Sequence, residues 1–547
     1  MAKRLAITVS GAVSLGSYEA GVLYEVLYAI GQHNQNPQTT EDDKIYIDVL
    51  TGASAGGMSV ALAAQKLLYD ADALNDPYQN GLYQAWVLDI DVDGLLSFQK
   101  DESSDCSIFS SDLIAQLSQQ YLRSRYTSGT IPPAKMHAAL GPEKTLKLGL
   151  ALSNLNGLDY GRKTLTGGEF VYSQFQDEYC RALTLSDDND QVWKGIQQAA
   201  VACGAFPFAF RSQDLERQRA EFTDENLVTA NLGLDPLTFT YTDGGVFQNE
   251  PLGIAKNFVD EIDNHLNSGS RAYLFIAPDP KVSNVDRQFC AHLGNFHTMA
   301  ARLASAIFYQ SRFQDWIRAE QVNEQVELFN TRANQVRELV KDGVLTAELT
   351  KPVSTVLLDQ LFPANADLDT ARTQLRKQFQ AEYAELLNTP AIGQANADAW
   401  IDAILVLEMA ANLHEKDEMY IYTIMATGEE LAGAQLMAFL GFFDQSYRQH
   451  DYDLGRMKAQ EFLASAGAQQ KGPLPLVRYT PQPVRPIDST LAGAKIKDAP
   501  LEKRKALRDR LKSRADIILK EANLPIVFRE PLELFYVNKK INEFLGL

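Results

Sequence analysis

The sequence predicts a three-layer α/β/α domain with a mostly parallel sheet, followed by a mainly helical C-terminal region. Two observations lead to this fold class. The first 70 residues alternate twice between a short apolar strand, a turn of small residues and a helix, which is typical of α/β layers. Beyond about residue 290, apolar residues recur at intervals of three and four, as in amphipathic helices.

The predicted elements of the first domain follow from apolar runs that are closed by glycine or proline. Two strand–turn–helix units come first, and later strands lead up to a pair of prolines near residue 280. In order, we expect strands at 4–9 and 45–50, helices at 18–30 and 58–67, a strand at 147–153, a helix at 192–203, a strand-to-turn junction at 241–245 and a strand at 271–277.

The chain is long enough for several domains, and its composition changes along its length. We expect a sheet domain over 1–290 and a mainly helical domain or cap over 291–470. A connector with five prolines between 473 and 486 opens the third part, 471–547, which ends in a basic helical tail. The helical part would cover a site on the first domain or shape a groove beside it.

Charge and composition exclude several classes of protein. Of the 547 residues, 45% are hydrophobic and 22% charged, so most of the chain should fold, and the net charge of −19 argues against bulk attraction to nucleic acid or anionic membrane. We expect no membrane-spanning helix and no signal peptide. Four scattered cysteines suit a reducing cytoplasm, with peripheral contact to a membrane left open.

A candidate nucleophile stands at the second strand-to-helix turn. Gly52, Ser54 and Gly56 fit G-x-S-x-G, and the residues between and after them, Ala53, Ala55 and Gly57, are all small. Such a turn exposes the serine hydroxyl and aims the positive end of the next helix at it. The sequence therefore predicts a nucleophile elbow with Ser54 as the attacking residue.

A serine hydroxyl needs a base, and two assignments compete. The first is a Ser-Asp-His triad, with a histidine from elsewhere in the chain. The second is a dyad in which a carboxylate accepts the proton directly. Asp243 suits that role because it ends a strand just before Gly244 and Gly245. The candidate histidines are His265, His292, His297, His414 and His450.

Stabilisation of an oxyanion requires backbone donors, and the turn over 11–16 offers successive N–H groups. We expect no metal and no cofactor. The run from His414 begins like H-E-x-x-H but has Glu418 where the second histidine belongs, and no phosphate-binding or nucleic-acid motif occurs.

Three motifs in this order resemble the patatin-like phospholipase family: the small-residue loop Ser10–Gly21, the G-x-S-x-G-G around Ser54, and the D-G-G that begins at Asp243. The run Gly204–Pro207 is also similar to the segment before the family's D-G-G turn, so the resemblance covers about residues 4–280. It implies an α/β/α fold and a dyad without histidine. Ser54 would be the nucleophile and Asp243 the base.

The resemblance further implies that backbone N–H groups of Gly11, Ala12 and Val13 form the oxyanion hole. The family's usual loop has three glycines, any residue, a basic residue and a glycine. Here Ala12, Val13 and Leu15 replace two glycines and the basic residue, and we expect Ala12 to add a Cβ where glycine would tolerate positive φ. Residues 439–444 and 448–456 resemble a C-terminal segment of larger bacterial relatives, with a structural role expected.

These observations predict a serine lipid acyl hydrolase of the phospholipase A or lysophospholipase kind, acting through an acyl-enzyme on phospholipid or another acyl lipid. Phe206, Phe208 and Phe210 are candidates for an apolar lining near the site. Two alternatives stay open: an α/β-hydrolase esterase with a histidine triad, and a regulated or decayed relative that acts as an interaction protein.

Overall fold

The computed structural model divides into two compact units. Unit 1 comprises residues 1–255, 272–314 and 421–547, and unit 2 comprises 256–271 and 315–420. The structure describes residues 2–547 apart from 99–101, 103–106, 128, 164–167, 225, 234, 264–269, 279–288, 294–298, 300–301, 304–305, 308–309, 312–313, 362–367, 391, 412–418, 435–437, 466–471 and 522–537.

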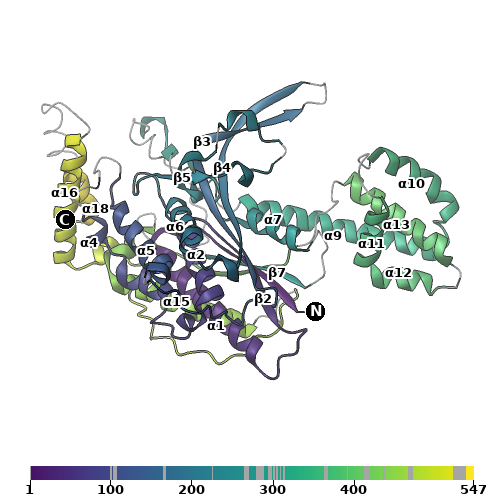
Figure 1. The fold of residues 1–547 in the computed structure, drawn as a ribbon, viewed down its shortest axis with the longest axis horizontal. Coiled ribbons are helices and arrows are strands. Elements are labelled where there is room, and N and C mark those ends of the chain that lie inside the picture. Colours follow the sequence, from purple (N-terminus) through teal and green to yellow (C-terminus); the bar gives the residue numbers. More distant parts are fainter. Residues whose placement is uncertain are drawn as a thin grey trace. The chain divides into compact units, whose positions relative to one another are not determined.

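Unit 1 is built around one mixed sheet, whose strand order is β5-β6-β3-β2-β1-β7-β8, with β4 paired to β3. Its central pairs are parallel, which confirms the predicted mostly parallel sheet flanked by helices (Figure 1). The strands are β1 (Lys3–Val9), β2 (Ile45–Gly52), β3 (Thr145–Lys163), β4 (Glu169–Thr184), β5 (Gln213–Arg217), β6 (Leu237–Asp243), β7 (Arg271–Pro278) and β8 (Ile421–Ala426).

The helices are interspersed among the strands through the first 280 residues and predominate after them. They are α1 (Gly16–Gln35), α2 (Ser54–Tyr69), α3 (Gly81–Tyr83), α4 (Val92–Leu95), α5 (Ser111–Thr127), α6 (Asp190–Cys203), α7 (Leu252–Asp263), α9 (Gln314–Lys341), α10 (Ala347–Leu361), α11 (Leu368–Gln378), α12 (Gln380–Leu387), α13 (Gly393–Ala410), α15 (Gln445–Ser465), α16 (Leu501–Glu521) and α18 (Asn538–Leu545).

The register of the central strands brings three chain segments to one edge of the sheet. Val9 of β1 pairs with Gly52 of β2, and Gly52 pairs with Leu150 of β3. The antiparallel strand β6 then places Asp243 opposite Leu152. The loop after β1, the turn after β2 and the end of β6 are therefore neighbours, although they are far apart in sequence.

Strands β5 and β8 and the arm formed by β3 and β4 lie outside the sequence prediction. Strands β3 and β4 continue beyond the other strands as a two-stranded arm (Figure 1). Strand β8 comes from the stretch expected to be helical and pairs in parallel with β7. Its six residues alternate between half-buried and buried positions, a pattern too short to stand out beside long helices.

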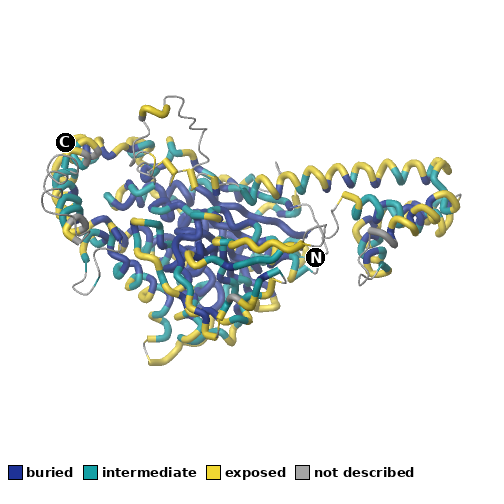
Figure 2. The backbone as a smooth tube through the Cα atoms, turned by 90° about the horizontal axis from the view of Figure 1, so that it is seen from above, coloured by how far each residue is buried: buried dark blue, intermediate teal, exposed yellow. Residues whose placement is uncertain are grey.

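The buried residues of unit 1 run through the sheet and the helices packed on it (Figure 2). Helices α1 and α15 approach closely where glycines remove side chains. A Cβ on Gly21 would lie 2.1 Å from the carbonyl oxygen of Tyr452, and one on Gly455 would lie 2.2 Å from that of Tyr18. Nearby, Arg456 and Glu25 form a fully buried ion pair at 3.0 Å. The expected structural role of residues 448–456 agrees with this packing.

Unit 2 has a helical core of its own. Trp400 of α13 is fully buried, and its indole Nε1 donates to the carbonyl of Ala333 in α9 at 3.0 Å. The ring of Phe379 packs edge-on against the same indole. Compactness alone does not define an independently folding domain, so the predicted boundaries at 290 and 470 stay predictions.

Candidate active site

Ser54 occupies a strained turn between β2 and α2. Its φ is +50°, a left-handed conformation that is uncommon for a residue with a side chain. The turn ends a strand and begins a 16-residue helix, so the N-terminal N–H groups of α2 surround the serine. This is the local geometry expected of a nucleophile elbow.

The small residues around Ser54 are required by close backbone contacts. A Cβ on Gly56 would lie 2.3 Å from the carbonyl oxygen of Ser10, so β1 passes directly against the first turn of α2. Gly244, beyond the end of β6, is packed as tightly, since a Cβ there would lie 2.1 Å from the carbonyl oxygen of Ala151. Any larger residue would push the elbow or the Asp243 turn away from the sheet.

Asp243 is held rigidly at the end of β6. Its N–H donates to the carbonyl of Ala205 at 3.0 Å, and its own carbonyl accepts from the Ser153 hydroxyl at 2.7 Å. The carboxylate oxygen Oδ1 accepts from the N–H of Gly245 at 2.7 Å. The backbone and one carboxylate oxygen are thus fixed, which leaves Oδ2 to face Ser54.

The hydroxyl of Ser54 donates to Oδ2 of Asp243 at 2.5 Å. This length is at the short end of hydrogen bonds between a hydroxyl and a carboxylate. Both side chains are buried, with 6% exposure for Ser54 and 1% for Asp243. Burial raises the pKa of Asp243 to about 7, while the hydrogen bonds from Ser54 and Gly245 lower it.

The loop after β1 lies against Ser54 but differs in detail from the prediction. A Cβ on Gly11 would lie only 3.1 Å from that of Ser54. The N–H of Gly11, however, donates to the carbonyl of Asn249 at 3.0 Å. Among the residues that the structure describes, none accepts a hydrogen bond from the N–H of Ala12 or Val13. These two donors lie in the turn beside the serine.

The expectation that Ala12 would occupy the position suited to positive φ is wrong. Its φ is −143°, and the left-handed residue is Val13, with a φ of +53°. Valine is β-branched, so this conformation is a genuine outlier. Ser54 at the elbow and Val13 in the loop after β1 are therefore both strained, and such strain is concentrated at functional sites.

Asn249 is a site residue that the motifs did not reveal. Its carbonyl accepts from Gly11, its side-chain Nδ2 donates to Glu250 at 2.9 Å, and its Oδ1 would lie 2.7 Å from a Cβ on Gly245. It thus bridges the loop after β1 and the turn after Asp243. Its signal in the sequence is a run of polar residues before Pro251, too short to separate from an ordinary turn.

Ser14 connects the same loop to the C-terminal part of unit 1. Its hydroxyl donates to the carbonyl of Ala438 and accepts from the N–H of Gly441 at 3.1 Å. Arg448, which is buried on α15, donates to the carbonyls of Gly441 and Phe442 and so holds the segment 438–442 in place. We call these contacts the Ser14 clamp.

The candidate histidines for a triad take no part in this arrangement where the structure describes them. His450 is buried on α15 with Asp451 as its partner, and His292 is exposed. Neither hydrogen-bonds Ser54 or Asp243 among the described contacts. His265, His297 and His414 lie outside the described residues, as does the H-E run at 414–418.

The three phenylalanines predicted as an apolar lining are placed differently from one another. The rings of Phe206 and Phe439 pack edge-on with centroids 5.5 Å apart, and Phe210 packs against Phe109 at 5.8 Å. Phe208 is 76% exposed and has a φ of +67°. Two of the three therefore belong to an aromatic cluster, and one faces solvent.

Two comparisons relate the chain to known proteins. Residues 7–256 match the family described as Patatin-like phospholipase. The chain is also 25% identical over 439 residues to an uncharacterized membrane protein of Mycobacterium tuberculosis, covering 69% of this chain and 39% of that protein. The chain thus spans about two fifths of the length of this relative.

Proposed function

We propose that this chain, whose residues 7–256 match the patatin-like phospholipase family of lipid hydrolases, is a serine lipid acyl hydrolase working through a Ser54–Asp243 dyad. The observation that carries the proposal is the 2.5 Å hydrogen bond between the Ser54 hydroxyl and Asp243 at a strained elbow. A serine, a base and backbone donors are what acyl transfer needs.

In the first half of the reaction, Oγ of Ser54 attacks the ester carbonyl carbon while its proton passes to Oδ2 of Asp243. The N–H groups of Ala12 and Val13, with the positive end of α2, would stabilise the oxyanion that forms. The carbon–oxygen bond of the ester then breaks. The leaving alcohol takes the proton from Asp243, and the acyl group stays on Ser54.

In the second half, a water molecule attacks the acyl-enzyme and gives its proton to Asp243. The tetrahedral intermediate collapses, Ser54 recovers its proton from Asp243, and the free fatty acid leaves. Asp243 suits this cycle because its pKa of about 7 lets it both accept and return a proton near neutral pH.

Exposed aromatic side chains near the site support an interfacial substrate. Phe247, four residues beyond Asp243, is 39% exposed, and its ring centroid is 6.3 Å from that of Phe175 on β4. Phe170 and Val171, near the beginning of the same strand, are more than half exposed. An apolar surface of this kind suits contact with aggregated lipid. We propose peripheral membrane contact, and a cytoplasmic location stays a prediction.

The described part of the chain contains no helix that is long and apolar enough to cross a bilayer.

Active-site labelling tests the proposal. A fluorophosphonate should label the parent chain at Ser54 and leave the Ser54→Ala variant unlabelled. The exposed Ser124→Ala variant on α5 serves as the control and should be labelled like the parent. Hydrolysis of p-nitrophenyl butyrate should fall by about 10³-fold or more in Ser54→Ala, because the covalent route is lost.

Circular dichroism should show that the Ser54→Ala variant keeps its fold. A parent chain that is neither labelled nor active on any ester would instead favour the interaction-protein alternative. Near-parent activity in Ser54→Ala would exclude Ser54 as the nucleophile.

A further inference from the structure

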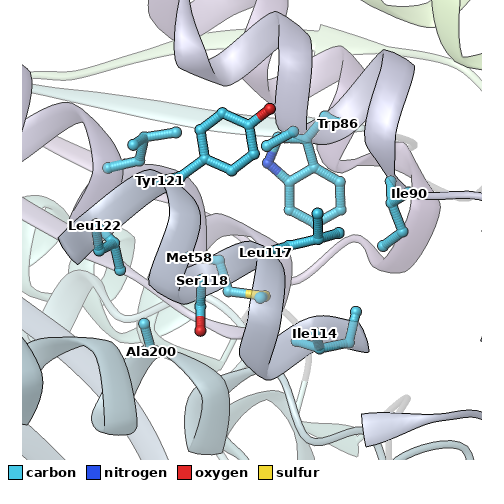
Figure 3. Close-up of a pocket in the computed structure, with 11 residues that line it drawn as sticks. Met58, Trp86, Ile90, Ile114, Leu117, Ser118, Tyr121, Leu122 and Ala200 are labelled. Atoms are coloured by element: carbon cyan, nitrogen blue, oxygen red, sulfur yellow. The ribbon is translucent and has the colours of Figure 1, made fainter. Parts of the chain in front are cut away.

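An apolar pocket lies beside the candidate nucleophile and is not explained by the dyad. Side chains from α2, α5, α6 and the π-helix η3 (Gln84–Asp89) converge on one space (Figure 3). Its lining residues are Met58, Leu62, Ala85, Trp86, Ile90, Ile114, Leu117, Ser118, Tyr121, Leu122 and Ala200.

The few polar atoms in this lining already have protein partners. Nε1 of Trp86 donates to the Ser59 hydroxyl at 2.9 Å, and the hydroxyl of Tyr121 donates to the carboxylate of Asp89. The hydroxyl of Ser118 donates to a backbone carbonyl and accepts from Gln197 at 2.9 Å. With these groups satisfied, the pocket offers a ligand only apolar contact, which suits a hydrocarbon chain.

One wall of the pocket begins at the nucleophile. Ser54, Met58 and Leu62 are spaced by four residues and share one face of α2. At 1.5 Å per residue, Met58 lies about 6 Å and Leu62 about 12 Å along the helix axis from Ser54. A chain that leaves an ester carbonyl at Ser54 along this face meets Met58 first and Leu62 next.

The pocket also borders the other two parts of the site. A Cβ on Gly16, at the end of the loop after β1, would lie 2.7 Å from the ring of Trp86. A Cβ on Gly204 would lie 2.7 Å from the sulfur of Met58. Gly204 precedes Ala205, whose carbonyl fixes the N–H of Asp243. Two lining residues, Trp86 and Met58, therefore contact the segments that lead to the oxyanion loop and to the base.

Trp86 and Ala85 enter the lining from a π-helix, which is a rare element that occurs frequently at functional sites. Met58, Ala85, Leu117 and Tyr121 are only half-buried, whereas Leu62 and Ala200 are almost fully buried. The half-buried residues form the open rim, and the buried ones form the closed end.

We propose that this pocket holds the acyl chain of the ester that Ser54 attacks, and that Leu62 and Ala200 at its closed end limit the chain's length. The inference rests on the proposed function and names its substrate as a long-chain fatty acyl ester. Each methylene group that moves from water into the pocket favours binding, so long chains should be preferred over short ones.

A matched pair of variants tests this role. Leu117→Asp places a carboxylate in the rim, whereas Leu88→Asp places the same group on the exposed side of η3, outside the lining. The readout is the ratio of kcat/KM for p-nitrophenyl palmitate to that for the butyrate ester, both in mixed micelles. We expect this ratio to fall at least about tenfold in Leu117→Asp, the equivalent of about two buried methylene groups, and to stay near parent in Leu88→Asp.

A direct binding measurement tests the pocket independently of hydrolysis. Binding of the fluorescent fatty acid cis-parinaric acid is measured on the inactive Ser54→Ala variant, alone and combined with Leu117→Asp or Leu88→Asp. The affinity should fall at least about tenfold with Leu117→Asp and not with Leu88→Asp. Melting temperatures of all variants show whether each one is folded.

The outcomes distinguish the two proposals. A palmitate-to-butyrate ratio that is equal in Leu117→Asp and Leu88→Asp, with activity lost in Ser54→Ala, overturns the proposed role of the pocket and leaves the proposed hydrolase function intact. Fatty-acid binding that Leu117→Asp weakens, in a parent chain without hydrolase activity, supports the pocket and overturns the proposed function. Binding that neither variant changes overturns the pocket whatever the activity.

Discussion

Asp243 carries a carboxyl group in an environment that resists its charge. It is fully buried, and among the residues that the structure describes only the Ser54 hydroxyl and the N–H of Gly245 donate to its carboxylate. Burial raises its pKa to about 7, which is a cost to folding and a gain for proton transfer. The same desolvation would therefore serve the proposed chemistry while it weakens the fold.

The pH profile of hydrolysis should report this carboxyl group. The base must be ionised to accept the Ser54 proton, so kcat/KM on a soluble ester should fall as the pH drops below about 7 and level off above it. Asp243→Asn keeps the shape but accepts no proton, and its residual rate should lack this step. A parent profile that stays flat from pH 5 to pH 8 would contradict the assignment of Asp243 as the base.

The free energy of unfolding of the parent chain should also depend on this carboxyl group. It should fall as the pH rises, whereas the activity should increase. The folded-state pKa is raised above the ordinary aspartate value of 3.8, so the folded protein binds the proton more tightly than the unfolded chain does. The parent therefore loses stability as the pH rises from about 4 to about 7. In denaturant titrations, the free energy of unfolding of Asp243→Asn, relative to that of the parent, should increase by a few kcal/mol between about pH 4 and about pH 7. No change across the window would mean that Asp243 is not desolvated.

Val13 provides a second test at the residue scale. Its φ of +53° costs an L-residue about 1–2 kcal/mol, and glycine avoids this cost. Val13→Gly should therefore be more stable than Val13→Ala by about 1 kcal/mol, the reverse of the usual order. Urea unfolding of the two variants measures the difference. A less stable glycine variant would show that the loop adopts another conformation in solution.

At the scale of elements, the loop after β1 depends on a segment more than 400 residues away. The Ser14 clamp joins this loop to residues 438–442, and α15 supports that segment through Arg448. Residues 439–444 were predicted to have a structural role, and their contacts lie next to the proposed oxyanion donors. The loop's conformation therefore depends on the C-terminal part of unit 1.

Removing the clamp should change the reaction rate more than substrate binding. In Ser14→Ala the N–H of Gly441 loses its acceptor, and the loop can shift away from Ser54. We expect kcat on a soluble ester to fall at least about tenfold with KM nearly unchanged, because small misplacements of catalytic groups are costly. Ser17→Ala, which removes only a bond within its own helical turn, is the comparison. A lower melting temperature with unchanged kcat would reduce the clamp to a purely structural contact.

For the whole molecule, net charge and apolar surface would determine the proposed docking on lipid. The charge of −19 repels anionic membranes, while exposed side chains such as Phe247 and Phe170 suit apolar docking. The two contributions respond differently to salt, because screening weakens only the electrostatic one.

Fatty-acid release from phosphatidylcholine vesicles should therefore change by less than about twofold between low and high salt. Adding anionic lipid should slow the release at low salt, and high salt should relieve the slowing. Release that falls steeply as salt rises would show that electrostatic attraction drives docking. Turnover of soluble esters with none on any phospholipid, lysophospholipid or galactolipid would leave only a generic esterase.

The prediction of the fold succeeded where neighbours in sequence are also neighbours in space. Strands β1 and β2, the helices after them and the elbow at Ser54 are local, and each carries its own signal in apolar spacing and small residues. Strands β5 and β8 and the arm of β3 and β4 were missed. Their positions depend on pairing with distant strands, which a local pattern does not encode.

By itself, the sequence determined the parallel-sheet fold class and the two residues proposed for the dyad, because both rest on short motifs with strict local geometry. Only the tertiary structure decided which atoms meet: the strand register sets Asp243 beside Ser54, and the N–H of Gly11 is taken by Asn249. It also decided that Val13, not Ala12, carries the backbone strain. The physical reason is that such contacts depend on packing among segments hundreds of residues apart, and packing is a property of the whole fold.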